Sequence, residues 1–171
     1  MVDAGNGTAG RAIALLGRII EYWALLGGIL LVGIALMTTL SAAGSFLFAK
    51  PIPGDFEMVE VVVAVAAFSF LPYCELSHAN VTADIFTTWA SRRGVAVFTM
   101  IAGVVALVFA LILLWRMYAG LLDYRQYVET TTILKFPIWM AYLPILVSLV
   151  LLAVAAVVTL WEAIRAFAAT D

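Results

Sequence analysis

Charged residues are scarce in this chain. Lys, Arg, Asp and Glu together account for 12% of its 171 residues, whereas 65% are hydrophobic and the mean hydropathy is +1.12. Soluble globular domains carry about 25% charged residues, so this chain has too little polar surface to keep a compact globule in solution. We therefore expect lipid to surround most of it. A cytosolic enzyme and a secreted domain are excluded, and the even spread of apolar residues excludes a protein with a single membrane anchor.

Cysteine and histidine are almost absent, which removes several kinds of chemistry. Cys74 is the only cysteine, so the chain has neither an internal disulfide nor a paired-thiol redox motif. His78 is the only histidine, which excludes a haem held by two histidines of this chain and argues against a redox-complex membrane anchor. We find no metal-ligand spacing, hydrolase motif or phosphate-binding glycine loop. We expect no cofactor, no metal site and no enzyme activity from this chain alone.

Basic charge is also low. The chain has 9 Lys and Arg against 11 Asp and Glu, and its pI is about 5.3. Such a balance offers no positive field for a phosphate backbone, so nucleic acid is not an expected partner.

Long uncharged runs are the main feature of the sequence. Tyr22 to Ala49 contains 28 uncharged residues, Gly94 to Trp115 contains 22, and Phe136 to Trp161 contains 26. A transmembrane helix needs about 20 apolar residues. A further apolar stretch, roughly Phe56 to Ser77, is interrupted by Glu60, Pro72 and Glu75. We predict an all-α integral membrane protein with one domain (1–171) and four transmembrane helices, at about 23–48, 56–77, 95–118 and 137–161.

The short connections predict the orientation. Membrane proteins keep more Lys and Arg in their cytoplasmic connections. One side of the predicted topology carries five such residues and the other carries three, diluted by acidic residues. We therefore predict that both termini are cytoplasmic. The five are Arg11, Arg18, Arg92, Arg93 and Arg165, and the three are Lys50, Arg125 and Lys135.

Two segments on the cytoplasmic side have the pattern of interfacial amphipathic helices. In segment 1–22, Thr8 is a candidate N-cap, and apolar residues share one face while Arg11 and Arg18 share the other. In connection 79–93, Val81, Ile85 and Trp89 recur every four residues. We expect both segments to lie along the inner membrane surface.

Charges within the predicted spans are candidates for function. Glu60 and Arg116 lie at similar depths near the outer ends of the second and third spans. Three interpretations are open: both side chains reach the headgroups, they form a structural ion pair, or Glu60 acts in a proton relay. Glu75 and His78 lie a turn apart at the inner end, where we expect a hydrated carboxylate and a neutral imidazole.

Small residues recur at spacings that allow helices to approach closely in lipid. They are Ala24 and Gly28 in the first span, and Ala102, Ala106 and Ala110 in the third. The four spans contain no duplicated half or interrupted helix pair, the usual signs of a transport site within one chain. The pattern therefore favours a subunit of a larger assembly.

Three segments between the spans have recognisable patterns. Lys50 to Glu57 (KPIPGDFE) is a short polar loop that enters the second span at a Glu; Tyr73 to Phe86 follows that span; and Glu129 to Trp139 (ETTTILKFPIW) approaches the last one. Together with four spans and no soluble domain, they resemble the small membrane subunit, the DctQ-like component, of tripartite ATP-independent periplasmic (TRAP) transporters.

The match to the patterns of that family is close but incomplete. The second segment is similar to Gly-His-Ile-x-Val-Asp, which places His78 and Asp84 at motif positions, with Ser77 in place of Gly and Ala79 in place of an aliphatic residue. The third is similar to Thr-x-x-Leu-x-Ile-Pro-x-Trp. It places Pro137 and Trp139 at motif positions, with Phe136 in place of Ile. None of these departures removes a charged group.

The resemblance implies a three-part uptake system in the bacterial cytoplasmic (inner) membrane. A periplasmic binding protein captures an organic acid, and a large membrane subunit, the M component, moves it inward with an ion gradient, usually sodium. The small subunit would brace the large one and help to form the docking surface. On this interpretation its partners are the large subunit, the binding protein and membrane lipid.

The resemblance also selects candidate contact residues, because charge complementarity steers the docking of a soluble protein. The alternative is that these charges are simply solvated. The candidates for docking are Lys50, Asp55, Glu57, Arg125, Glu129 and Lys135.

A second hypothesis, from a different class of protein, is a small proton-coupled homo-oligomeric exporter with Glu60 as its exchange site.

Overall fold

The computed structural model describes residues 8–77 and 92–168, and within these ranges the chain is helical apart from two connections. Each of the four helices contains a segment long and apolar enough to cross a membrane. This confirms the predicted all-helical fold with four spanning segments. The helices are α1 (Thr8–Phe48), α2 (Asp55–Leu76), α4 (Arg92–Tyr127) and α5 (Trp139–Ala168).

Several helix boundaries differ from the predicted spans, and α5 also continues past residue 161 to Ala168. α1 is a single helix that begins at Thr8, so the predicted interfacial segment continues directly into the first span. α4 continues past residue 118 to Tyr127. α5 begins at Trp139 rather than at Pro137, because the neighbouring Ile138 and Phe136 are paired with residues on the other side of the loop. The connection 79–93 lies outside the described residues except for its last two, which begin α4.

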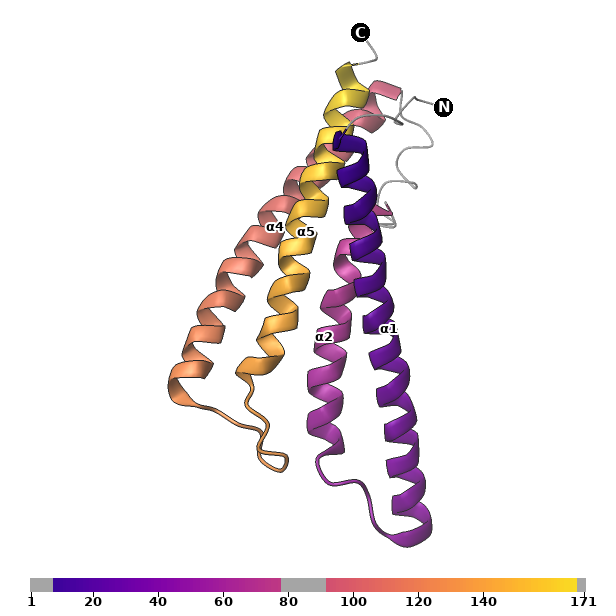
Figure 1. Ribbon diagram of the computed structural model, residues 1–171, viewed down its shortest axis with the longest axis vertical. Coiled ribbons are helices and arrows are strands. Elements are labelled where there is room, and N and C mark those ends of the chain that lie inside the picture. The colour runs from indigo at the N-terminus through magenta and orange to yellow at the C-terminus, as the bar shows by residue number, and fades with distance from the viewer. Residues whose placement is uncertain (1–7, 78–91, 169–171) are drawn as a thin grey trace.

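The helices form a single row in the order α1, α2, α5, α4 (Figure 1). α5 packs against both α4 and α2, and α1 packs mainly against α2. α1 begins and α5 ends at the same end of the bundle (Figure 1). We call the opposite end, which holds the connections 49–54 and 128–138, the distal end. There the α1–α2 pair and the α4–α5 pair are spread apart (Figure 1).

The best-packed surface of the bundle is one face of α5. Buried residues recur along it three or four positions apart, the spacing of one helix face. Leu149 is fully buried and, with Ile145 and Leu152, forms a core with Ala110 of α4. Phe68 of α2 packs against the same cluster. α5 is therefore the central helix of the row.

Close contact between α1 and α2 depends on a glycine next to the one that the sequence singled out. A Cβ atom on Gly27 would lie 2.9 Å from Cβ of Ser69, whereas a Cβ atom on Gly28 would meet nothing within 4 Å. Ala24 of α1 is buried, as its spacing suggested. On α4, Ala110 is buried but Ala102 is exposed. Small residues thus allow close packing, but at only some of the predicted positions.

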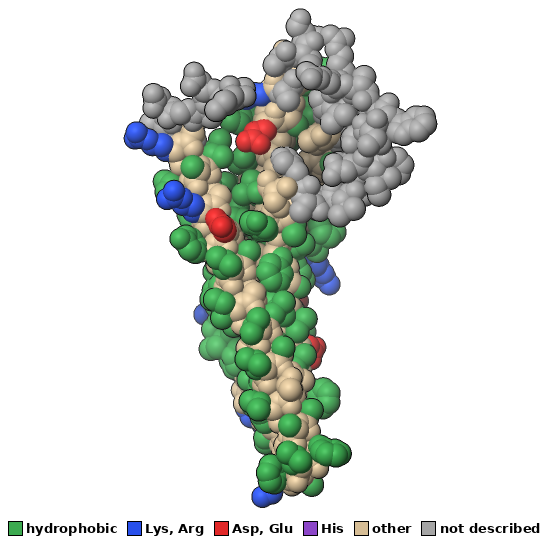
Figure 2. Space-filling view, turned by 90° about the vertical axis from the view of Figure 1, so that its right-hand side faces the viewer, with side chains coloured by type: hydrophobic (Ala, Val, Ile, Leu, Met, Phe, Trp, Pro, Cys, Tyr) green, Lys and Arg blue, Asp and Glu red, His purple; other side chains and the backbone are tan. Residues whose placement is uncertain are grey.

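Most of the outer surface is apolar. Figure 2 shows hydrophobic side chains covering most of the visible face between the two ends of the bundle. Ile29 and Leu36 of α1 and Phe109 of α4 are each more than half exposed. Such a surface is stable only against lipid or another apolar protein surface. The chain is therefore a multi-pass membrane protein.

Candidate partner-binding end of the helical bundle

The distal end carries all six candidate docking charges. Lys50 lies in the α1–α2 connection, Asp55 and Glu57 lie in the first turn of α2, and Arg125 lies in the last turn of α4. The remaining two lie in the connection 128–138, which we call the distal loop. Asp55 and Glu57 are half-buried, whereas the four exposed candidates are Lys50, Arg125, Glu129 and Lys135.

Asp55 ties the end of α1 to the start of α2. The Ser41 hydroxyl donates to Oδ2 of Asp55 at 2.6 Å, and the Phe56 backbone N–H donates to Oδ1 at 2.8 Å. The same serine oxygen accepts from the Ile52 N–H at 3.1 Å. Ser41 is only 1% exposed, so its hydroxyl is satisfied within the protein rather than by solvent. One carboxylate and one hydroxyl thus fix the turn between the two helices.

The distal loop is folded back on itself. The Thr131 N–H donates to the Phe136 carbonyl at 2.9 Å, and the Ile138 N–H donates to the Glu129 carbonyl at 3.2 Å. The Thr131 hydroxyl also accepts from the Phe136 N–H at 3.0 Å. Lys135 has a φ of 56°, the left-handed conformation that reverses the chain. The loop is therefore an ordered hairpin-like structure that presents Lys135 near its bend.

Glu57 holds the distal loop against α2. Its Oε1 accepts a hydrogen bond from the Ile133 N–H at 2.8 Å, and its Oε2 accepts one from the Leu134 N–H at 3.0 Å. Hydrogen bonds to an ionised acceptor are about twice as strong as neutral ones. Both carboxylate oxygens are therefore used to bind a loop 76 to 77 residues further along the chain.

Gly54 provides the space for this contact. Its φ of 76° lies in the left-handed region that favours glycine, and it immediately precedes α2. A Cβ atom there would lie 2.6 Å from Cγ of Leu134. The residue whose N–H is bound by Glu57 therefore also packs its side chain against the backbone of Gly54.

The structure divides the six docking candidates into two groups. Asp55 and Glu57 hold together the two connections of the distal end, a role that the sequence interpretation missed. For Asp55, the signal in the sequence was Ser41, a polar residue in a long apolar run. Lys50, Arg125, Glu129 and Lys135 are exposed and remain candidates for contact with a partner.

Glu60 and Arg116 are not brought together. Both side chains are exposed, and neither has a hydrogen bond or an ion pair with any other residue that the structure describes. Arg116 belongs to α4, which packs mainly against α5, whereas Glu60 belongs to α2. An ion pair between these two side chains, one of the three interpretations left open by the sequence, is therefore not formed within the described part of the chain.

Glu75 is buried rather than hydrated. It is 8% exposed, and its Oε1 accepts a hydrogen bond at 3.0 Å from the Thr159 hydroxyl of α5. Thr159 is itself buried, at 4% exposed. The expectation of a hydrated carboxylate was wrong because α5 covers this face of α2. Its predicted neighbour His78 and the motif residue Asp84 lie outside the described residues.

The two other motif residues lie where the distal loop joins α5. Pro137 forms an isolated antiparallel bridge with Thr130, and its carbonyl accepts a hydrogen bond from the Met140 N–H at 3.1 Å. Trp139 is the first residue of α5 and is half-buried. Together they connect the ordered loop to the central helix of the bundle.

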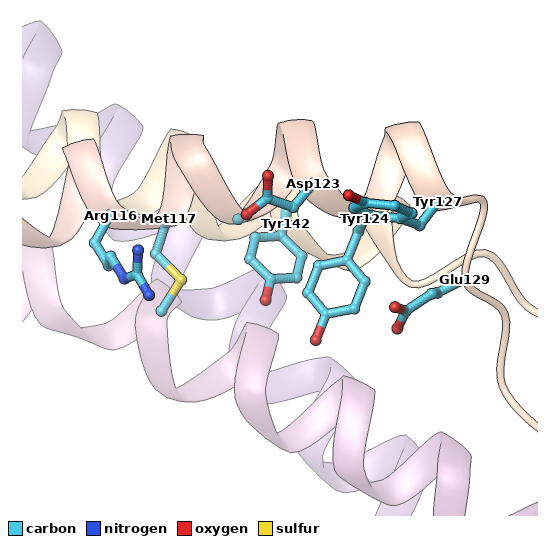
Figure 3. Close-up of a pocket in the computed structure, with 8 residues that line it drawn as sticks. Arg116, Met117, Asp123, Tyr124, Tyr127, Glu129 and Tyr142 are labelled. Atoms are coloured by element: carbon cyan, nitrogen blue, oxygen red, sulfur yellow. The ribbon is translucent and has the colours of Figure 1, made fainter.

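A cavity opens beside the distal half of α4 (Figure 3). Its volume is about 620 Å³. Figure 3 shows Arg116 at one end, Glu129 at the other, and the rings of Tyr124 and Tyr142 between them. These two rings lie 5.2 Å apart between centroids. Polar groups of both signs therefore line one cavity.

A second cavity of about 550 Å³ lies between α2 and the distal loop. Glu57, Val61, Leu134 and Phe136 are among the residues that line it. Among the residues that the structure describes, no group of three or more His, Cys, Asp or Glu side chains has the geometry to hold a metal ion.

Comparison with known proteins gives one match. The profile of a protein family described as "Tripartite ATP-independent periplasmic transporters, DctQ component" matches residues 14–166. No curated protein and no solved structure matches the chain. The matched segment contains all four spanning helices except the first turns of α1 and the last residues of α5.

Proposed function

Because this chain belongs to the DctQ component family of tripartite ATP-independent periplasmic transporters, a transporter component family, we propose that it is the small subunit that scaffolds the large membrane subunit of such a transporter. The complete system takes up an organic acid that a periplasmic binding protein delivers, with a sodium gradient as the driving force. The chain lies in the bacterial cytoplasmic membrane with both termini in the cytoplasm.

The scaffold role is supported by the large apolar helix surface that the chain's own helices leave uncovered. In the most apolar window of α4 only 11% of residues are buried, and in that of α1 only 22%. These two helices form the ends of the row, so each has only one major neighbour. A row with two uncovered flanks presents apolar area to a second membrane protein, and helix packing in lipid favours such broad contacts.

Co-purification tests the scaffold proposal. The full chain, tagged at its C-terminus and expressed from its own operon, is purified in mild detergent and its companions are identified by intact mass. We expect a stoichiometric membrane partner of many predicted spans. A stable homo-oligomer of this chain without such a partner would contradict the proposal and favour the exporter alternative.

Four exposed charges at the distal end are proposed to guide the binding protein. Lys135 is the best placed of them, because the ordered distal loop holds it near its bend with a fixed backbone conformation. Charges at the rim of an interface mainly raise the association rate. The proposal therefore concerns encounter rather than the final affinity of the complex. The other three are Lys50, Arg125 and Glu129.

Reversing the charge of Lys135 should slow docking. In proteoliposomes that contain the whole membrane complex, we expect Lys135→Glu to lower uptake several-fold at low binding-protein concentration and to leave it unchanged at saturation. Lys135→Arg keeps the charge and serves as the matched control. Equal uptake by both variants at every concentration of binding protein would reject this docking role.

A further inference from the structure

The cavity beside α4 lies at the level of lipid headgroups. The 22 uncharged residues from Gly94 to Trp115 span roughly 33 Å at 1.5 Å per residue, close to the thickness of a hydrocarbon core, about 30 Å. Arg116 follows this run directly, and α4 continues to Tyr127. Arg116 and the two turns after it therefore lie where the hydrocarbon core meets the headgroups at the distal end.

The cavity carries charges of both signs in a fixed order. Arg116 and Asp123 are seven residues apart, so they share one face of α4 and are separated by roughly 10 Å along its axis. Asp123 and Glu129 both line the cavity on the side further from the hydrocarbon core. In the direction away from the hydrocarbon core, the cavity therefore presents the Arg116 guanidinium first and the carboxylates of Asp123 and Glu129 after it.

The charged side chains of the cavity are not paired with one another. No hydrogen bond or ion pair among the described residues uses the guanidinium of Arg116 or the carboxylates of Asp123 and Glu129. Tyr124 and Tyr142 form an aromatic wall of the cavity. Gly120 allows this wall: a Cβ atom there would lie 3.1 Å from Cε1 of Tyr142.

We propose that this cavity binds the zwitterionic headgroup of an amine phospholipid of the phosphatidylethanolamine type. In such a lipid the phosphate is attached nearer to the acyl chains and the ammonium lies beyond it, the order in which Arg116 and the two carboxylates occur. The guanidinium donates paired hydrogen bonds to the phosphate. Asp123 and Glu129 accept from the ammonium, and the tyrosine rings favour a nearby cation.

The chemistry of the cavity discriminates among lipids. An anionic headgroup without an amine would leave both carboxylates unpaired and repelled, and a choline headgroup has no N–H to donate to them. The part of α4 on the hydrocarbon-core side of Arg116 is suited to acyl chains. Phe109 and Ile112 lie on the same side of the helix as Arg116, and their side chains are 56% and 57% exposed. The inference does not depend on the proposed transport function, since it requires only the membrane-spanning fold.

Retention of lipid by the purified protein tests the proposal. The full chain, with whatever membrane partner co-purifies, is reconstituted in nanodiscs with equal amounts of phosphatidylethanolamine, phosphatidylglycerol and phosphatidylcholine. It is then released into detergent for native mass spectrometry. We expect the wild type to retain phosphatidylethanolamine about tenfold over the other two lipids, and Arg116→Gln to lose that retention about tenfold.

Three further variants separate charge from folding. Arg125→Gln removes an exposed arginine from the same helix outside the cavity and should retain lipid like the wild type. Arg116→Lys should retain part of the binding, because a point charge remains without the planar fork. Asp123→Asn combined with Glu129→Gln should abolish the preference for phosphatidylethanolamine over phosphatidylglycerol while total lipid stays similar.

Several results would overturn the proposal. They are equal retention of all three lipids by the wild type, equal loss in Arg116→Gln and Arg125→Gln, or unchanged selectivity in the double carboxylate variant. Loss of the lipid whenever the large subunit is present would show that the partner protein, and not lipid, fills the cavity.

Discussion

Replacing Glu57 with glutamine should release the distal loop from α2. The carboxylate accepts two backbone hydrogen bonds, at 2.8 and 3.0 Å, whereas an amide offers one acceptor and turns its NH₂ group toward the other donor. In hydrogen–deuterium exchange we expect the amides of Ile133 and Leu134 to exchange about tenfold faster or more. Because the same loop presents Lys135, uptake that depends on the binding protein should fall as well.

Glu60→Gln is the matched control. It makes the same chemical change one turn further along α2, at an exposed side chain with no partner among the described residues. We expect exchange in the distal loop and transport activity to stay at wild-type levels. Faster loop exchange in both variants would contradict the specific role of Glu57. Complete loss of transport in Glu60→Gln, with assembly intact, would instead support the exporter hypothesis.

Replacing Gly54 with alanine should disturb the same contact from the other side, and more severely. A non-glycine residue in the left-handed conformation costs about 1–2 kcal/mol, and Gly54 has a φ of 76°. In addition, the new Cβ would lie 2.6 Å from Cγ of Leu134, so the side chain or the loop must move. We expect a lower melting temperature in detergent and loss of the protection of the Leu134 amide.

A double-mutant cycle separates the two causes. Leu134→Ala removes the atoms that the new Cβ would meet, so the pair Gly54→Ala with Leu134→Ala should recover the steric part of the loss but not the conformational part. Gly33→Ala is the control, because a Cβ there meets nothing within 4 Å and α1 gains helix propensity. Purely additive effects of Gly54→Ala and Leu134→Ala would show that the two residues do not constrain each other.

Together these contacts explain why the distal end can be ordered although its helices are spread apart. Asp55 fixes the turn between α1 and α2, and Glu57 fixes the loop between α4 and α5 to the same end of α2. The start of α2 thus joins the two halves of the row at the face that we propose for the binding protein. A scaffold of this kind holds charges in fixed positions, which lowers the entropic cost of docking.

The sequence alone determined the class of the protein and the number of its spans. The uncharged runs of 28, 22 and 26 residues leave few solutions other than membrane helices, because backbone polar groups in lipid must be satisfied within a helix. The second span was also predicted correctly despite Glu60, Pro72 and Glu75, since its middle is strongly apolar. The family was recognisable from the order of three loop segments, and the match over residues 14–166 confirms it.

The tertiary structure decided which of the polar residues are structural. Glu57 and Glu60 lie one turn apart on the same helix, yet only Glu57 meets the N–H groups of Ile133 and Leu134. Likewise, Gly27 rather than Gly28 lies against Ser69, and Glu75 is covered by Thr159. Helical periodicity places a residue on a face of its own helix. Which face is covered, and by which distant segment, depends on how the helices pack.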